Sequence, residues 1–283
     1  MTFPIRGHFQ QRFSAAPTAT QGRPTLACIS FEARDVLRNS VVAADARGSE
    51  DLNLSQFWRE LADGGCTVAD DFFSQERCYL VLTPTAAGTL QPVTGRRLEI
   101  LEAVLSGLPQ KNVASDLHLA PSTIALNARL ALESRGIKAK PSRAHPLLML
   151  AARVTLEGRR TFVRCSSLVS REGKALRVLS AARPDRSLEQ QLPKAELAVI
   201  RRLIEGLSYT QIAAERGTSI RTIANQITAV FRRLRVSGRN ELVQRLFLDQ
   251  GQPHRVSQPV RQTLSRQLVE SARETWVSQR ASA

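Results

Sequence analysis

The chain has 283 residues, enough for roughly two or three small domains, and a formal net charge of +15. It has no run of about 18 apolar residues, which excludes a membrane-spanning helix. Its four cysteines lie far apart without metal-ligand spacing, so we expect reduced cysteines, no metal and no cofactor in a cytoplasmic protein. Residues 1–92 hold 8 basic and 10 acidic residues, whereas residues 93–283 hold 32 basic and 15 acidic ones. This asymmetry predicts a polyanionic partner for the later part, either nucleic acid or an acidic membrane surface.

The first 92 residues predict a disordered start followed by a small folded unit. Residues 1–22 are rich in Gln, Ala, Thr and Pro, which favours disorder, and they lack the apolar core of a signal peptide. Residues 23–92 contain two short apolar runs, TLACISF and CYLVLTP, and a helix-like stretch, LSQFWRELADG. We expect a small α+β unit there, with Phe57, Trp58 and Leu61 in its core. Asp70 and Asp71 are interpreted as solvated loop acids.

The middle of the chain contains one pattern twice. Residues 98–138 and 197–237 align without a gap at an offset of 99 residues, and most apolar positions meet apolar residues. Identical residues meet at Leu98, Gly107, Leu108, Ala114, Thr123, Ile124 and Ala125. An internal repeat determines the architecture, and this one has the spacing of a helix-turn-helix. The predicted fold is therefore mainly α with short β segments (α+β), with two tandem four-helix units and a small strand-rich segment before each.

The first helical unit is predicted at 93–155 and a β-rich connector at 156–188. Residues 146–152 are almost wholly apolar and predict the fourth helix of the first unit. The runs RVTLEG, TFVRCSSLVS and ALRVLSAA, starting at residue 153, predict strands. Because CYLVLTP stands in a similar place before the first unit, the duplication is expected to include a hairpin in front of each unit.

Residues 189–250 predict the second helical unit in more detail. Gly206 ends a first helix, Ser208 caps a second, Gly217 turns the chain and Ser219 caps a third, which runs to about residue 234. The outer face of the third helix carries amide, hydroxyl and guanidinium groups, from Arg221, Thr222, Asn225, Gln226, Thr228, Arg232 and Arg233. Amides pair with adenine, and arginine pairs with guanine or phosphate, so this face suits the major groove of duplex DNA.

Residues 192–243 also carry a specific signature. It consists of the EGLS…IA turn, then Ser219, Thr222, Ile223, Val230, Leu234 and Val236, and the closing pairs Gly238-Arg239 and Glu241-Leu242. This stretch resembles the LuxR-type (GerE-like) helix-turn-helix of bacterial transcription regulators. The resemblance implies a four-helix domain that binds DNA, usually as a dimer, with the third helix in the major groove and the fourth often pairing subunits.

The face and the resemblance together select the candidate contacts. The base-reading candidates are Arg221, Ala224, Asn225, Gln226 and Thr228. The phosphate-binding candidates, as the resemblance implies, are Thr210, Thr222, Arg232 and Arg233. Gln226 stands where the family often has histidine and Ala224 where lysine is common, which leaves the preferred DNA sequence open.

The first copy keeps the scaffold but has a changed outer face. Leu126 stands in the place of Asn225, and Glu133, which would repel phosphates, stands in the place of Arg232. Two interpretations stay open. This copy contacts DNA through Thr123, Asn127 and Arg129, or it has a scaffold or pseudo-dimer role in which its leucines pack against protein.

These observations predict a bacterial, sequence-specific DNA-binding transcription regulator, cytoplasmic and nucleoid-associated, with double-stranded DNA as its partner. RNA polymerase is a further candidate partner, and pairing is expected as a homodimer or an intramolecular pseudo-dimer. Residues 251–283 predict a linker and a basic tail with helical spacing. No nucleophile, acid/base pair or phosphate loop indicates an enzyme. The main alternative is an adaptor whose units bind RNA polymerase or another regulator, and a sigma-factor-like subunit ranks below it.

Overall fold

Helices and one antiparallel sheet make up residues 31–249, the part of the chain that the computed structural model describes. The first half consists of α1 (Phe31–Arg47), β1 (Glu50–Asn53), α2 (Leu54–Asp63), β2 (Cys66–Phe73), β3 (Arg77–Pro84), α3 (Gly95–Leu105), α4 (Gln110–Asp116), α5 (Pro121–Glu133) and the short 3-10 helix η1 (Pro141–Arg143). The second half consists of α6 (Pro146–Leu156), β4 (Phe162–Val169), β5 (Ala175–Ala182), η2 (Pro184–Leu188), α7 (Lys194–Ile204), α8 (Tyr209–Arg216), α9 (Ile220–Leu234) and α10 (Arg239–Asp249). The architecture is mainly helical and α+β.

The sheet joins two hairpins from distant parts of the chain. Its strand order is β1-β4-β5-β3-β2, and the hairpins β2–β3 and β4–β5 meet where β3 pairs with β5. In that pairing Leu80 lies opposite Leu179, and these residues are 99 positions apart, the offset of the helical repeat. A hairpin therefore precedes each helical unit, and the two strand-rich segments share one sheet instead of forming separate units.

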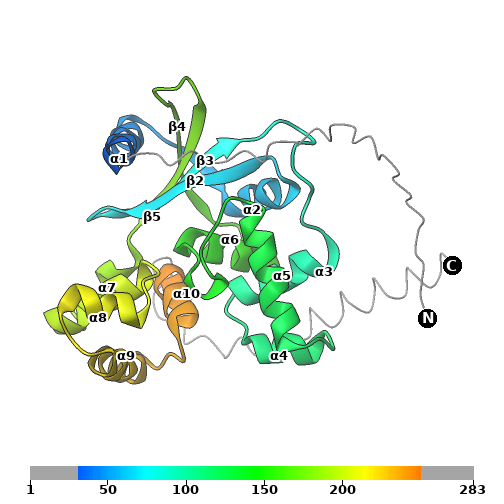
Figure 1. Ribbon diagram of the computed structural model, residues 1–283. Coiled ribbons are helices and arrows are strands. Elements are labelled where there is room, and N and C mark those ends of the chain that lie inside the picture. The colour runs from blue at the N-terminus through cyan, green and yellow to red at the C-terminus, as the bar shows by residue number, and fades with distance from the viewer. Residues whose placement is uncertain (1–30, 250–283) are drawn as a thin grey trace, which may run out of the picture.

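The sheet is covered on both faces. α1 lies on one face, where Val41 packs with Phe72 and Tyr79 of the sheet. The opposite face belongs to a larger core that continues through α2 and α6 into the helices below (Figure 1). Every residue from Pro146 to Val154 in α6 is buried, which explains its almost wholly apolar sequence. In Figure 1, α3–α5 and α7–α9 lie below the sheet on two sides, with α10 between them.

Most local predictions agree with these elements. Phe57, Trp58 and Leu61 are buried in α2, as expected. The expected fourth helix of the first unit is α6, but it continues to Leu156, so the prediction of a strand in RVTLEG is wrong. Arg153 explains the extension, because its guanidinium bonds Glu157 one turn later at 2.7 Å and also reaches the Gln244 side chain.

Two features near the N-terminal side were not foreseen. The helix α1 has a weak apolar periodicity and was missed. Asp70 is not a solvated loop acid: it is buried in β2, where it accepts hydrogen bonds from Arg34 and Arg38 of α1. These guanidinium groups hold the pKa of the Asp70 carboxyl below its usual value although burial acts to raise it. The predictions for residues 1–22 and for the C-terminal linker and tail lie outside the described residues.

Candidate nucleic-acid interface

The second helical unit has the caps that its sequence predicts. Ser208 and Gln211 form a reciprocal capping box at the start of α8, and Gly217 ends that helix in the left-handed conformation, at φ 61°. The Ser219 hydroxyl accepts a hydrogen bond from the Thr222 N–H at 3.0 Å and so begins α9. Each cap satisfies backbone donors that the first turn leaves without partners. The turn between α8 and α9 is thereby held by local chemistry.

The inner side of α9 is buried and its outer side is open. Ile223, Ile227 and Val230 are fully buried at helical spacing. Of the base-reading candidates, Arg221, Asn225 and Thr228 are exposed. The other two, Ala224 and Gln226, are half-buried, and the Gln226 Oε1 atom is buried without a hydrogen-bond partner in the described part of the chain. The side chain of Gln226 therefore points less outward than its helical position suggested.

The phosphate-binding candidates lie at both ends of this surface. Thr210 and Thr222 are exposed in the first turns of α8 and α9, where N–H groups and the helix dipole favour an anion. Arg232 is exposed at the end of α9 and makes no ion pair with the described residues. Arg233 instead donates to Glu196 of α7 at 2.6 Å. The two neighbouring arginines are thus not equivalent.

Two apolar residues at this surface were missed. Tyr209 and Ile220 are the first residues of α8 and α9 and are 37% and 50% exposed, unusually high for large apolar side chains. Each directly follows a capping serine. A large apolar residue directly after such a cap is the sequence signal that could have identified both positions. Their position beside Thr210 and Arg221 puts apolar contact surface within the candidate interface.

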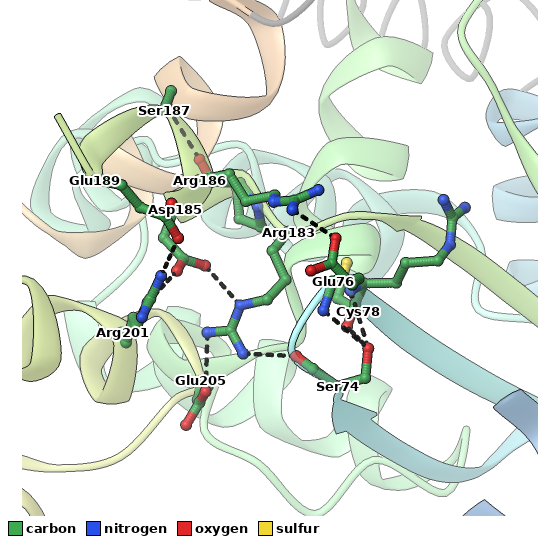
Figure 2. Close-up of polar contacts among 12 residues, drawn as sticks. Ser74, Glu76, Cys78, Arg183, Asp185, Arg186, Ser187, Glu189, Arg201 and Glu205 are labelled. Atoms are coloured by element: carbon green, nitrogen blue, oxygen red, sulfur yellow. Dashed lines mark hydrogen bonds and ion pairs between the residues drawn. The ribbon is translucent and has the colours of Figure 1, made fainter. Parts of the chain in front are cut away.

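A buried ion network ties the second unit to the sheet. Asp185 in η2 is fully buried and accepts hydrogen bonds from Arg183 at 2.9 Å and from Arg201 of α7 at 2.8 Å (Figure 2). Arg183 also donates to the Ser74 carbonyl in the β2–β3 turn and to Glu205 after α7, both at 2.9 Å. Because these partners come from the sheet, η2 and the helical unit, the network sets the orientation of α7 relative to the sheet.

The first helical unit presents a different face. Leu126 and Leu130 of α5 are 46% and 39% exposed. Arg129 is paired with Glu133 at 3.2 Å, and the Asn127 amide donates to the Thr123 carbonyl of its own helix at 2.9 Å. The three candidates of this unit, Thr123, Asn127 and Arg129, therefore lie together on α5. The side chains of Asn127 and Arg129 already bond other residues of that helix.

The backbone of the two units corresponds closely. The starts of α3, α4 and α5 lie 99 residues before those of α7, α8 and α9. Left-handed residues also recur at this offset, in the pairs Gly107 and Gly206, His118 and Gly217, and Gly136 and Arg235. His118 adopts φ 52°, a left-handed conformation that is uncommon for residues other than glycine.

The units contact one another through the ends of their fourth helices. The Arg239 guanidinium at the start of α10 donates to the Leu203 and Ile204 carbonyls at 2.7 Å, within its own unit. It also donates across to the Ser142 and Ala144 carbonyls, at 3.1 and 3.0 Å. Burial, with a smaller effect of nearby Arg143, lowers the pKa of Arg239 to about 10, so the group stays charged at neutral pH.

Two glycines complete this contact in a reciprocal way. A Cβ atom on Gly107 would lie 3.1 Å from the Gln244 side chain of α10, and one on Gly206 would lie 2.9 Å from the Arg143 carbonyl. Gln244 further donates to the Leu105 carbonyl at 3.2 Å. Equivalent glycines thus let each unit approach the fourth-helix region of the other. The apolar face of α10, with Leu242, Val243 and Leu246, is buried inside the chain.

Part of this region matches a known protein family. Residues 190–246 match the model of GerE, described as bacterial regulatory proteins of the luxR family. These residues are therefore similar to a LuxR-family helix-turn-helix domain, which suggests a DNA-binding transcription regulator. No curated protein and no solved structure matches the chain. The matched span covers α7 to most of α10 and does not include the first helical unit.

Residues 31–249 lack two further features. No group of three or more His, Cys, Asp and Glu residues in that part is arranged to hold a metal ion. None of its helices is long and apolar enough to cross a membrane.

Proposed function

We propose that this protein is a bacterial, sequence-specific transcription regulator that reads duplex DNA with α9. The observation that carries the proposal is the exposed polar face of α9, with Arg221, Asn225 and Thr228, inside the segment that matches the LuxR family. These side chains suit base edges in the major groove. Arg232 and the first turns of α8 and α9 supply phosphate contacts on both sides of them.

The first helical unit acts in this proposal as a built-in partner. The recurring helix starts and left-handed residues support its origin as a drifted copy. Its contact with α10 occupies the apolar face that would otherwise pair two chains. The chain then binds DNA as an intramolecular pseudo-dimer, with one reading unit and one supporting unit, and cytoplasmic DNA is its target.

Selection of bound fragments from a random duplex pool with the full chain tests the reading function. Binding of the selected site and of a scrambled site is then measured at several salt concentrations. We expect a preference for the selected site and an affinity that falls steeply with salt, because phosphate contacts release bound cations. Absence of DNA binding even at low salt would contradict the proposal.

A second measurement addresses the pairing. If the chain is a pseudo-dimer whose first unit has drifted, only one unit reads bases. We then expect a selected site with one conserved segment, and one chain bound per DNA in sedimentation. Two equivalent segments about one helical turn apart, bound by two chains, would indicate a homodimer instead.

The adaptor function has one observation in its favour, the exposed Leu126 and Leu130 on α5. An apolar pair at the place of a reading face suits a protein partner better than DNA, and RNA polymerase is the partner to test. If purified polymerase binds the parent chain without DNA and loses this binding in Leu126→Glu with Leu130→Glu, the first unit is an adaptor. The matched change Ala125→Glu on the same helix is the control.

A further inference from the structure

A cavity of about 340 Å³ lies between the sheet and the first helical unit, away from α9. One wall is formed by α1 and the edge strand β2, and the other by residues 136–139 after α5 and by the start of α6. The interior is lined by aliphatic side chains, including Leu37, Val68, Ile137 and Leu148. A cavity of this size is at the lower end for small-molecule sites and accommodates a molecule of a few carbon atoms.

The charged groups around this cavity are not all neutralised. Asp70 is bound by Arg34 and Arg38, so these three groups satisfy one another. The carboxylate of Asp71 and the ammonium of Lys138 also line the cavity. Both residues are exposed, so they lie at its open side, and neither makes an ion pair or a side-chain hydrogen bond with the described residues. Desolvation and the adjacent Asp70 raise the pKa of the Asp71 carboxyl, and the nearby Arg34 and Arg38 only partly oppose this rise.

His145 adds a polar group at the inner wall. Its Nδ1 atom accepts the Leu147 N–H at 3.3 Å, so the neutral ring carries its proton on Nε2. The ring is buried, and Nε2 has no hydrogen-bond partner within residues 31–249. Because the Nε2 atom is itself closed off from the cavity, the ring forms part of the wall and does not contact a ligand directly.

We propose that this cavity binds a small aliphatic zwitterion, namely an aliphatic α-amino acid. Its carboxylate pairs with Lys138, its ammonium pairs with Asp71, and its side chain packs against Val68, Ile137 and Leu148. A single molecule of this class pairs with both charges at the open side of the cavity and covers its apolar lining. A purely anionic or purely apolar ligand would leave Asp71 or both charges without a partner.

Calorimetric titration of the full chain, without DNA, tests the proposal. L-leucine is compared with isoamylamine, which lacks the carboxylate, with 4-methylpentanoate, which lacks the ammonium, and with glycine, which lacks the side chain. We expect saturable binding of leucine and binding of each analogue that is weaker by about tenfold or more, because each loses one charged or apolar contact. Undetectable leucine binding, or equal binding of 4-methylpentanoate, overturns the proposal.

Two variants assign the charges. Lys138→Met should remove the advantage of leucine over isoamylamine, and Asp71→Asn should remove its advantage over 4-methylpentanoate. The matched controls are Lys140→Met, an exposed lysine two residues away, and Asp51→Asn, an exposed acid on the other edge strand. Leucine binding at parental affinity in both cavity variants also overturns the site. Because the analogue series uses the parent chain, the test stands even if a variant fails to fold.

Discussion

The helices at 95–133 and at 194–234 start at positions 99 residues apart and share left-handed turns, yet the outer faces of α5 and α9 differ in chemistry. α9 exposes Asn225 and Arg232, whereas α5 exposes Leu126 and Glu133 at the same positions. Buried stripes and turns must be kept for a helix-turn-helix to fold. The outer face is under no such constraint, so two units with corresponding backbones can carry different surfaces.

The two units also differ in how they are held. Arg135 of the first unit donates to the Ala62 and Gln91 carbonyls beside α2, at 2.9 and 2.6 Å. The second unit is fixed through the buried Asp185 and its two arginines. Loss of one partner from a buried ionic network is costly, so the orientation of α9 depends on charges that the first unit does not need.

The largest expected effect separates two arginines that lie on opposite sides of the contact between the units. Arg239→Met should lower the free energy of unfolding by about 3 kcal/mol, because four carbonyl groups, three of them in buried hydrogen bonds, lose their donor. Arg143→Met, at a half-buried position on the first unit's side of this contact, should cost less than about 1 kcal/mol. Urea unfolding of both variants measures this. Equal losses would mean that the contact between the units is symmetric in energy as well as in position.

The next effect separates the two outer faces. Asn225→Leu, which installs the residue of the first unit, should weaken binding to the selected DNA site by roughly 1–3 kcal/mol and change the preferred sequence. Leu126→Ala should change the same affinity by less than about 0.5 kcal/mol. Fluorescence anisotropy with the selected duplex measures both. A comparable loss in Leu126→Ala would show that α5 also lies on DNA.

The third prediction concerns how the stability of the first unit depends on pH. Burial, with a smaller effect of Arg239, lowers the pKa of His145 from 6.5 to about 3. Between these values only the unfolded chain takes up the proton, so stability is full above pH 6.5 and falls as the pH drops below it, by up to about 1.4 kcal/mol per pH unit. His145→Asn keeps an acceptor for the Leu147 N–H and should flatten this dependence in urea unfolding at pH 5 to 7. The same change at exposed His118 is the control, and an unchanged slope in His145→Asn would refute the assignment.

The smallest effect distinguishes neighbours within α9. Arg232→Ala should reduce the slope of log affinity against log salt by about 0.9, the value for one phosphate contact. Arg233→Ala should reduce it less, because Glu196 holds this guanidinium at 2.6 Å. Titrations at four salt concentrations give both slopes. If Arg233→Ala has the larger effect, its ion pair with Glu196 opens on DNA.

The sequence by itself determined the local features of this protein. The repeat at an offset of 99, the capping serines, the glycine turns and the inner stripe of α9 follow from short-range periodicity and backbone preference. The same signals identified the exposed candidates Arg221, Asn225 and Thr228, and the LuxR-like segment that the family match supports. The division into six segments and the individual DNA contacts stay predictions.

Only the tertiary structure decided which distant segments contact one another and how. It joined the two hairpins through Leu80 and Leu179, gave Asp70 its partners in α1, extended α6 beyond its expected end and turned Gln226 partly inward. It also packed α10 against the first unit and left a cavity beside β2. These outcomes depend on contacts between residues far apart in the chain, for which neither periodicity nor capping carries information, because both act within a few residues.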